Sequence, residues 1–411
     1  MLGKVVFLFL CIVSFSHAQE FDDEFDEGFD NIDESIMVEE AVKQSYYLTG
    51  KLSQKANYAT HNQSPHNNLN SLQTSLYLEY EKSFTDNHKL RVSAKTFYDF
   101  IYNVKNDRNY AQEEKNSLQK ETEIFDLYLQ GKISSNMDYK IGRQVVVWGR
   151  SDTIRVTDIL NPLDNRSPGI TDIEDLRLPV GMAKIDYYFG NYNVNFIFIG
   201  ETRYSKLPAY KSDFYILNTR LPDEKIDKKP TIALSFNANF SSWDMSLYAA
   251  KVKSDETRAH DDIYMLGYAF DYIYDSWLFK AEGVYFDKYR LNNTQDKTFS
   301  NILVGLEYNG IEETVISFDI ANKYLPNTKD VTQSALRINS DFMNARLKAN
   351  YLISLYGRRF NEGGFQRVWL EYELNDALKS TLGYVDYMSG SSLFDVIEDN
   401  DMFFTSLEYS F

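Results

Sequence analysis

The sequence predicts an all-β protein, a transmembrane antiparallel up-and-down β-barrel of about 18 strands. Three observations lead to this prediction: alternating polarity along most of the chain, a regular exchange of short and long connections, and an aromatic-rich but polar composition. The chain of 411 residues contains 31 Tyr and 28 Phe, although its mean hydropathy is negative. A membrane barrel combines these properties, because only every second strand residue is apolar and aromatic residues form belts at both interfaces.

From residue 45 onward, segments of about ten residues alternate in polarity, which is the length of a tilted membrane strand. Residues 123–131 set Phe125, Leu127 and Leu129 against polar neighbours. The same pattern recurs at residues 301–309, 337–342, 347–355 and 367–374. Alternate strand residues point to opposite faces. We therefore expect the apolar members to face lipid and the polar members to face the barrel interior.

The connections between these segments have two lengths. Eight short turns, one of them at Asn309 and Gly310, alternate with nine long polar connections at residues 61–71, 103–120, 149–180, 203–229, 254–261, 290–296, 324–330, 358–364 and 389–401. All eight prolines lie in or beside the long connections, as expected because proline removes a hydrogen bond from a central strand. This rhythm predicts short periplasmic turns and long extracellular loops.

The N-terminal region predicts export. Residues 1–4 are basic, residues 5–15 are apolar and residues 16–18 are small or polar, which together predict a signal peptide at residues 1–18. The only cysteine, Cys11, lies within it. Residues 45–411 are then the barrel.

Residues 19–44 are predicted to be an acidic periplasmic tail. Of residues 19–40, eleven are Asp or Glu, while Phe21, Phe25 and Phe29 recur at helical spacing. This pattern fits a disordered tail, but it also fits a short helix that docks on a periplasmic partner or plugs the pore. A net charge of −17 argues against nucleic-acid binding.

The C-terminal segment predicts insertion into a membrane. Phe403, Leu407, Tyr409 and Phe411 fall at alternate positions, with Thr405 the polar member of the series. A terminal Phe with Tyr two residues before it resembles the signal by which bacterial outer-membrane barrels are recognised. We expect the chain to reside in the outer membrane of a Gram-negative bacterium, with outer-membrane lipid and the barrel-assembly machinery as partners.

The most unusual segment is residues 141–184. It contains the sequence Gly142-Arg-Gln-Val-Val-Val-Trp148-Gly149, followed by Asn161, Pro162 and Asp164. This segment resembles a proteobacterial outer-membrane family of uncharacterised function, porin-like in plan, with a Gly-Arg-Gln-x-Val-x-Trp-Gly strand and an Asn-Pro-x-Asp loop. Members often carry Glu-Ser after the Trp-Gly, where this chain has Arg150 and Ser151. The resemblance implies envelope transport, because the family's genes commonly lie beside inner-membrane exporters of the resistance-nodulation-division type.

The loop at residues 149–180 is far longer than a hairpin requires, and loops of this length are usually functional or disordered. It contains apolar residues to bury, and its arginines alternate with aspartates. Folded inward, it would form a constriction whose arginines bind carboxylate or phosphate groups; alternatively, internal salt bridges hold it over the barrel mouth. The constriction candidates are Arg143, Gln144, Trp148, Arg150, Arg155, Asp158, Asp164 and Arg166.

Residues suited to catalysis are sparse. Beyond residue 18 the chain has four His residues, at 61, 66, 88 and 260, without a His-x-x-x-His motif, a Gly-x-Ser-x-Gly motif or a phosphate-binding glycine loop. We predict no enzymatic activity, no cofactor and no metal.

These observations favour a porin-like channel for the diffusion of small anionic or amphipathic solutes, constricted by the loop at residues 149–180. The alternative is a non-conducting outer-membrane accessory of an envelope exporter, which docks on its periplasmic or exporter partner through residues 19–40.

Overall fold

The computed structural model describes residues 46–61, 68–85, 87–104, 110–221, 230–253, 262–289, 297–325, 329–390 and 394–411. Residues 45–411 form one compact unit. The predicted signal peptide and acidic tail lie outside the described residues.

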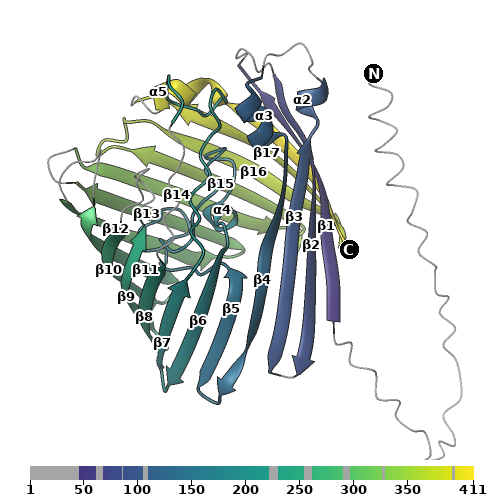
Figure 1. Cartoon of the computed structure of the whole chain (residues 1–411). Helices are drawn as coiled ribbons and strands as arrows, with labels where there is room; N and C mark the ends of the chain where they lie inside the picture. Colours follow the sequence, from purple (N-terminus) through teal and green to yellow (C-terminus); the bar gives the residue numbers. More distant parts are fainter. Residues whose placement is uncertain are drawn as a thin grey trace, which may run out of the picture. The chain divides into compact units, whose positions relative to one another are not determined.

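Eighteen antiparallel strands form a closed ring in which each strand pairs with the next and β1 pairs with β18 (Figure 1). The first nine are β1 (Tyr46–Ala59), β2 (Leu69–Thr85), β3 (His88–Asp99), β4 (Lys120–Ser134), β5 (Met137–Gln144), β6 (Val180–Phe189), β7 (Tyr192–Ile199), β8 (Thr231–Asn239) and β9 (Trp243–Lys253). The second nine are β10 (Asp262–Tyr274), β11 (Trp277–Tyr289), β12 (Lys297–Ile311), β13 (Thr314–Tyr324), β14 (Val331–Phe342), β15 (Leu347–Tyr356), β16 (Gly364–Asn375), β17 (Leu378–Met388) and β18 (Met402–Ser410). The predicted fold class and strand number are confirmed.

Helical segments are short and lie in the long connections. They are α2 (Ile101–Val104), α3 (Gln112–Leu118), α4 (Ile173–Leu176), α5 (Phe394–Ile397) and the 3-10 helix η1 (Glu398–Asn400). No helix in the described part of the chain has the length and apolar character needed to cross a membrane.

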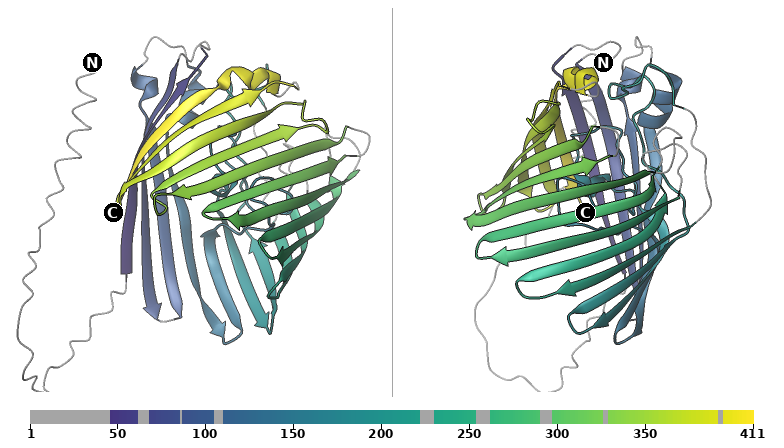
Figure 2. Two further views of the ribbon diagram at one scale, coloured as in Figure 1. Left: turned by 180° about the vertical axis from the view of Figure 1, so that it is seen from behind. Right: turned by 90° about the vertical axis from the view of Figure 1, so that its left-hand side faces the viewer.

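Short turns lie at one end of the ring and long loops at the other. Figure 2 shows the neighbouring strands and their connections from two sides. One predicted turn is displaced. Strand β12 continues past Asn309 and Gly310 to Ile311, so the chain reverses at residues 312–313. The Tyr308 ring lies over Gly310, where a Cβ atom would come within 2.2 Å of the ring hydroxyl, so a larger residue there would require the ring to move.

The alternation predicted for β4 holds only at its second half. Leu127 and Leu129 are exposed on the outer face, but Phe125 lines the interior together with Asp126. The cause is a β-bulge: Val92 of β3 pairs with Leu127, whereas Ala94 pairs with Ile124. One extra residue in a strand moves the side chains before it to the opposite face of the sheet. The prediction that Phe125 faces lipid was therefore wrong.

Aromatic side chains contact one another, within and between strands, near the short-turn end. Tyr187, Phe189 and Tyr192 form successive ring contacts, and Phe240 stacks on Trp243 with centroids 4.3 Å apart. Such a row is typical of the belt that barrels place at the membrane–water interface, where the rings contact both acyl chains and headgroups.

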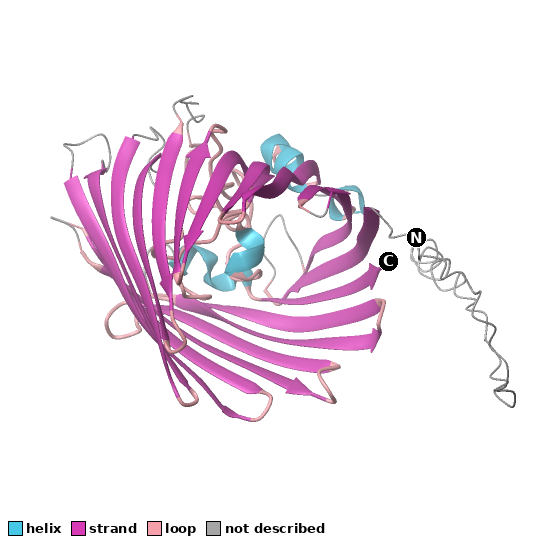
Figure 3. Cartoon of the chain, turned by 90° about the horizontal axis from the view of Figure 1, so that it is seen from below, coloured by secondary structure: helices cyan, strands magenta, loops and turns pink. Residues whose placement is uncertain are grey.

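The interior of the ring is partly filled by chain. Viewed along the barrel, loop segments and helical turns lie within the ring of strands (Figure 3). The main contribution is the connection between β5 and β6, residues 145–179, named here the inner loop. Its apolar residues Ile154, Val156 and Leu160 are buried in one cluster with inward residues of β6 to β16 and of β18. The apolar part of the inner loop therefore packs mainly against the wall of β6 to β16.

Candidate functional site

Gly142 begins the motif and lies near the end of β5. Its φ is +129°, and a Cβ atom would lie 2.1 Å from the carbonyl oxygen of Leu127 on the paired strand. A residue with a side chain does not fit this position. Two residues later, Gln144 ends β5. It is fully buried and donates to backbone carbonyls, with its Nε2 atom 3.1 Å from the oxygen of Lys140.

Asn161 joins the two ends of the inner loop. Its side chain is completely buried, and Oδ1 accepts a hydrogen bond from the backbone nitrogen of Val146 at 2.8 Å. Nδ2 donates to the carbonyl oxygen of Leu178 at 2.9 Å and to that of Gln144 at 3.3 Å. One amide thus satisfies backbone groups at both ends of the loop, which gives the Asn-Pro segment a structural function.

Pro162 and Asp164 extend this closure. The Pro162 carbonyl accepts from the Leu178 nitrogen at 2.7 Å, and the Asp164 nitrogen donates to the Leu176 carbonyl at 2.8 Å. The returning arm of the loop, which contains α4, is consequently paired with the outgoing arm inside the barrel.

Glu282 on β11 attaches the start of the inner loop to the barrel wall. The carboxylate is 1% exposed and accepts from the backbone nitrogens of Arg150 at 2.6 Å and Ser151 at 2.9 Å. It also accepts from the hydroxyl of Thr157 at 2.7 Å. Hydrogen bonds of this kind stabilise a buried carboxylate. The sequence reasoning missed Glu282, whose only signal is an acid aligned with the inward residues Val284 and Phe286.

Trp148, Gly149 and Arg150 lie against neighbouring strands. The Trp148 ring stacks on Tyr248 with centroids 4.6 Å apart. Arg150 donates to Ser246 at 3.0 Å and its Nε atom lies 3.1 Å from a carboxylate oxygen of Asp271. Residues 148–150 are therefore held by contacts with β9, β10 and β11.

Asp158, Arg155 and Arg177 form an internal network. Asp158 is 4% exposed and its Oδ2 atom lies 2.8 Å from Nε of Arg177 and 3.6 Å from Nε of Arg155. Arg155 also donates to the carbonyl oxygens of Asp158 and Asn161. These charged groups pair with one another within the loop, as the alternative with internal salt bridges expects.

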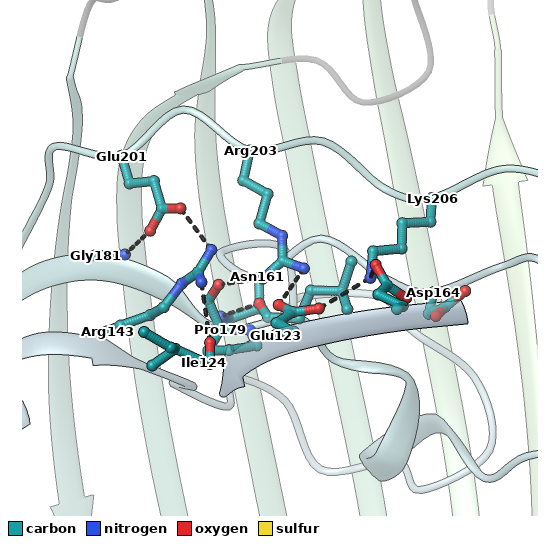
Figure 4. A network of polar contacts seen from close by, with 12 residues as sticks. Glu123, Ile124, Arg143, Asn161, Asp164, Pro179, Gly181, Glu201, Arg203 and Lys206 are labelled. Carbon is teal, nitrogen blue, oxygen red and sulfur yellow. Dashed lines mark hydrogen bonds and ion pairs between the residues drawn. The ribbon is translucent and has the colours of Figure 1, made fainter. Parts of the chain in front are cut away.

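Arg143 is also paired. It donates to Glu201 at 2.7 Å, and the other oxygen of this carboxylate accepts from the nitrogen of Gly181 at 2.6 Å (Figure 4). Arg203 follows in the connection after β7, which is described over residues 200–221, and lies 2.5 Å from Glu123 of β4. This part of the second connection therefore also enters the interior.

Asp164 and Arg166 attach the inner loop to β4. Arg166 binds Asp164 through two nitrogens, at 2.8 and 2.5 Å, and reaches Glu121 at 2.8 Å. Burial alone would raise the pKa of Asp164, but the hydrogen bonds and charge of Arg166 hold it below its ordinary value. The same contacts raise the pKa of Arg166, although its burial opposes this. Lys206 completes the cluster, 2.7 Å from Glu121.

Asp172 attaches the loop at a third place. It forms ion pairs with Arg337 of β14, at 2.9 Å, and with Arg367 of β16. Arg367 also donates to the Ile170 carbonyl, and its guanidinium lies 4.0 Å from the ring centroid of Trp369.

A cavity of about 1350 Å³ remains on the side of the inner loop that faces β1 to β4 and β16 to β18. Of the eight constriction candidates, Arg150, Asp164 and Arg166 line this cavity. Arg155 and Asp158 line a second, smaller cavity, whereas Arg143, Gln144 and Trp148 line neither of the two. The structure thus separates residues that the sequence placed in one group.

Lys55 on β1 and Lys95 on β3 also face the large cavity, although neither is among the predicted constriction candidates. Within the described residues, neither forms a hydrogen bond or an ion pair; Lys55 is repelled electrostatically by Lys95 and Arg367 and attracted by Asp99. The aromatic residues Phe97 and Trp369 line the same cavity.

The part of the chain that the structure describes has no group of three or more His, Cys, Asp or Glu side chains placed to hold a metal ion. His61 and His88 are at the surface in this part, whereas the other two predicted loop histidines, His66 and His260, lie outside it.

A family model described as "Protein of unknown function (DUF1302)" matches residues 8–411. The chain belongs to this family. Among curated proteins, none matches the sequence. That the Gly142 to Asp164 motif is a family signature stays a prediction.

Several solved structures share the fold of this DUF1302 protein. OpdK of Pseudomonas aeruginosa, in a structure with vanillate, has a TM-score of 0.56 and 11% identity, over 89% of this chain and 98% of that chain. OccAB3 of Acinetobacter baumannii has a TM-score of 0.54 and 13% identity, over 89% and 98%. OccK8 (OprE) of P. aeruginosa has a TM-score of 0.53 and 10% identity, over 89% and 97%.

Proposed function

We propose that this protein is an outer-membrane channel through which small anionic solutes, including amphipathic ones, diffuse. The observation that carries the proposal is the large cavity beside the inner loop, which Lys55 and Lys95 face without a described partner. Unpaired cations in a confined, low-dielectric passage attract anions and raise their local concentration.

The inner loop sets the width of this passage. It is bound to the wall through Glu282 and to β4 through Arg166, so its position is fixed by buried, charge-assisted contacts. The large cavity lies between the loop and the wall of β1 to β4 and β16 to β18, so solutes pass through this space, beside the contact of Arg166 with β4. Diffusion through such a constriction needs no covalent chemistry.

The aromatic residues of the cavity favour solutes with an apolar part. Phe97, Trp369 and Phe404 line the same space as the two lysines, and a solute with a ring and a carboxylate can contact both kinds of side chain. The structure of OpdK with vanillate, an aromatic carboxylate, supports this class of solute.

The test is the reversal potential of single channels in planar bilayers under a salt gradient. We expect anion preference in the wild-type chain, a loss of that preference in the double variant Lys55→Gln and Lys95→Gln, and its retention in the matched double variant Lys55→Arg and Lys95→Arg. A cation-selective wild-type channel would contradict the proposed solute. A barrel that stays silent, with and without residues 19–40, would favour the exporter accessory instead.

A further inference from the structure

A second cavity, of about 350 Å³, lies near the long-loop ends of β6 to β14, between these strands and the inner loop. About half of the residues that line it are apolar, and nearly all of these are buried, among them Ile154, Leu160, Ile199, Val284, Phe286 and Phe299. In the large cavity charged residues are the most frequent class. The buried apolar part of the small cavity offers a water molecule few polar partners.

The charged side chains at the margin of the small cavity pair with other residues of the chain. Glu201 binds Arg143 at 2.7 Å, and Lys253 binds Asp262. Arg203 and Asp158 are paired as described above, and the Lys323 ammonium lies 4.8 Å from the centroid of the Phe299 ring. An ion that entered the cavity would have to displace one of these contacts, so the cavity favours a neutral occupant.

One buried polar atom of the described lining lacks a partner. Asn301 of β12 lines the cavity, and its Oδ1 atom is buried without a hydrogen-bond partner within the described residues. A buried acceptor without a partner is unfavourable, and such an atom requires an explanation. A ligand that carries a hydroxyl or N–H group would satisfy it.

We infer that this cavity binds a neutral, mainly apolar molecule with one hydrogen-bond donor, of the alkylphenol class. An engineered apolar cavity of about 150 Å³ binds benzene, and the volume here leaves room for a ring with an alkyl chain. The site is separate from Lys55 and Lys95 and does not require conduction. Its ligand would contact Ile154 and Leu160 of the inner loop directly.

Binding to the full chain in amphipol is measured by equilibrium dialysis with three probes of one shape: 4-hexylphenol, hexylbenzene and 4-hexylbenzoate. Amphipol alone supplies the partition blank. Ala321→Phe places a ring in the cavity, because Ala321 lines it and is 4% exposed. Ile320→Phe is the matched control, because Ile320 is 38% exposed on the outer face. Heat-modifiable mobility on gels confirms that each barrel is folded.

We expect saturable 1:1 binding of 4-hexylphenol that weakens at least about tenfold in Ala321→Phe, because the ring fills the ligand volume, and that persists in Ile320→Phe. Asn301→Leu should abolish the preference for 4-hexylphenol over hexylbenzene while hexylbenzene still binds. This milder variant decides the matter if Ala321→Phe fails to fold.

Binding that is equal in Asn301→Leu and the wild type, or that does not exceed the amphipol blank, would overturn the inference. So would 4-hexylbenzoate binding as tightly as 4-hexylphenol, since an anion would then be the preferred ligand. None of these outcomes alters the selectivity measurement on Lys55 and Lys95, so the two proposals fail separately.

Discussion

The Glu282 carboxylate accepts a hydrogen bond of 2.6 Å from the backbone nitrogen of Arg150, and so one buried acid of the barrel wall holds the first turn of the inner loop. The two residues are 132 positions apart in the sequence. The contact belongs to a set on the same carboxylate, which Ser151 and Thr157 complete.

Replacement of Glu282 by Ala should destabilise the barrel and release the loop. Hydrogen bonds to a charged group contribute about 1.5–3 kcal/mol each, so the loss of three such bonds should lower the free energy of unfolding by at least about 3 kcal/mol. The measurement is urea unfolding followed by gel mobility, with current noise as the readout of loop motion. Glu312→Ala, in an exposed short turn, is the control; an equal loss there would refute the anchoring role.

Asn161→Asp tests the closure of the loop. The carboxylate can still accept from Val146, but it cannot donate to Leu178, so we expect a loss of about 1–3 kcal/mol for the unsatisfied buried groups. Limited proteolysis of the folded barrel should cleave the inner loop faster. Asn165→Asp, in the same loop, serves as control, and unchanged cleavage of Asn161→Asp would show that the amide is dispensable.

Deletion of residues 152–176 should raise the single-channel conductance, because the inner loop occupies the barrel interior. The wild-type chain and the deletion are compared in the same bilayers. A conductance that stays the same would place the narrowest part of the passage elsewhere, for example at residues 200–221 of the connection after β7.

The Asp164–Arg166 contact predicts a specific pH dependence. The pKa of Asp164 is lowered in the folded state, so its contribution to stability is present above the ordinary aspartate pKa of about 3.9 and is lost as the pH falls through the folded value. Asp164→Asn should therefore be less stable than the wild type at pH 7, and the difference should shrink below about pH 4. Unfolding curves over this range measure it; a constant difference would exclude the charge as its origin.

Strand number and alternation could be predicted from the sequence because both depend on local patterns of period two. Leu127 and Leu129 face outward as their spacing requires. The inward orientation of Phe125 could not be predicted, because a bulge depends on the pairing with the partner strand. The displaced turn after Gly310 has the same kind of cause, since a pairing irregularity extends β12.

The candidate site was less predictable, because its contacts join residues that are distant in sequence. The motif from Gly142 to Asp164 indicated an unusual loop, and the structure places that loop inside the ring. It could not show that Asn161 closes the loop, or that Arg143 is paired with Glu201. Lys55 and Lys95 lie in ordinary alternating strands, and only closure of the barrel brings Lys55 near Arg367.

The attachment points of the inner loop have a mechanical consequence. Arg166 binds Glu121 on β4, Arg150 and Thr157 bind Glu282 on β11, and Asp172 binds Arg367 on β16. These strands divide the eighteen into roughly equal thirds, so the loop is a three-way brace across the cylinder. A hollow cylinder flattens under lateral compression, whereas a braced one keeps its cross-section. The bore should therefore be insensitive to the tension and thickness of the surrounding bilayer.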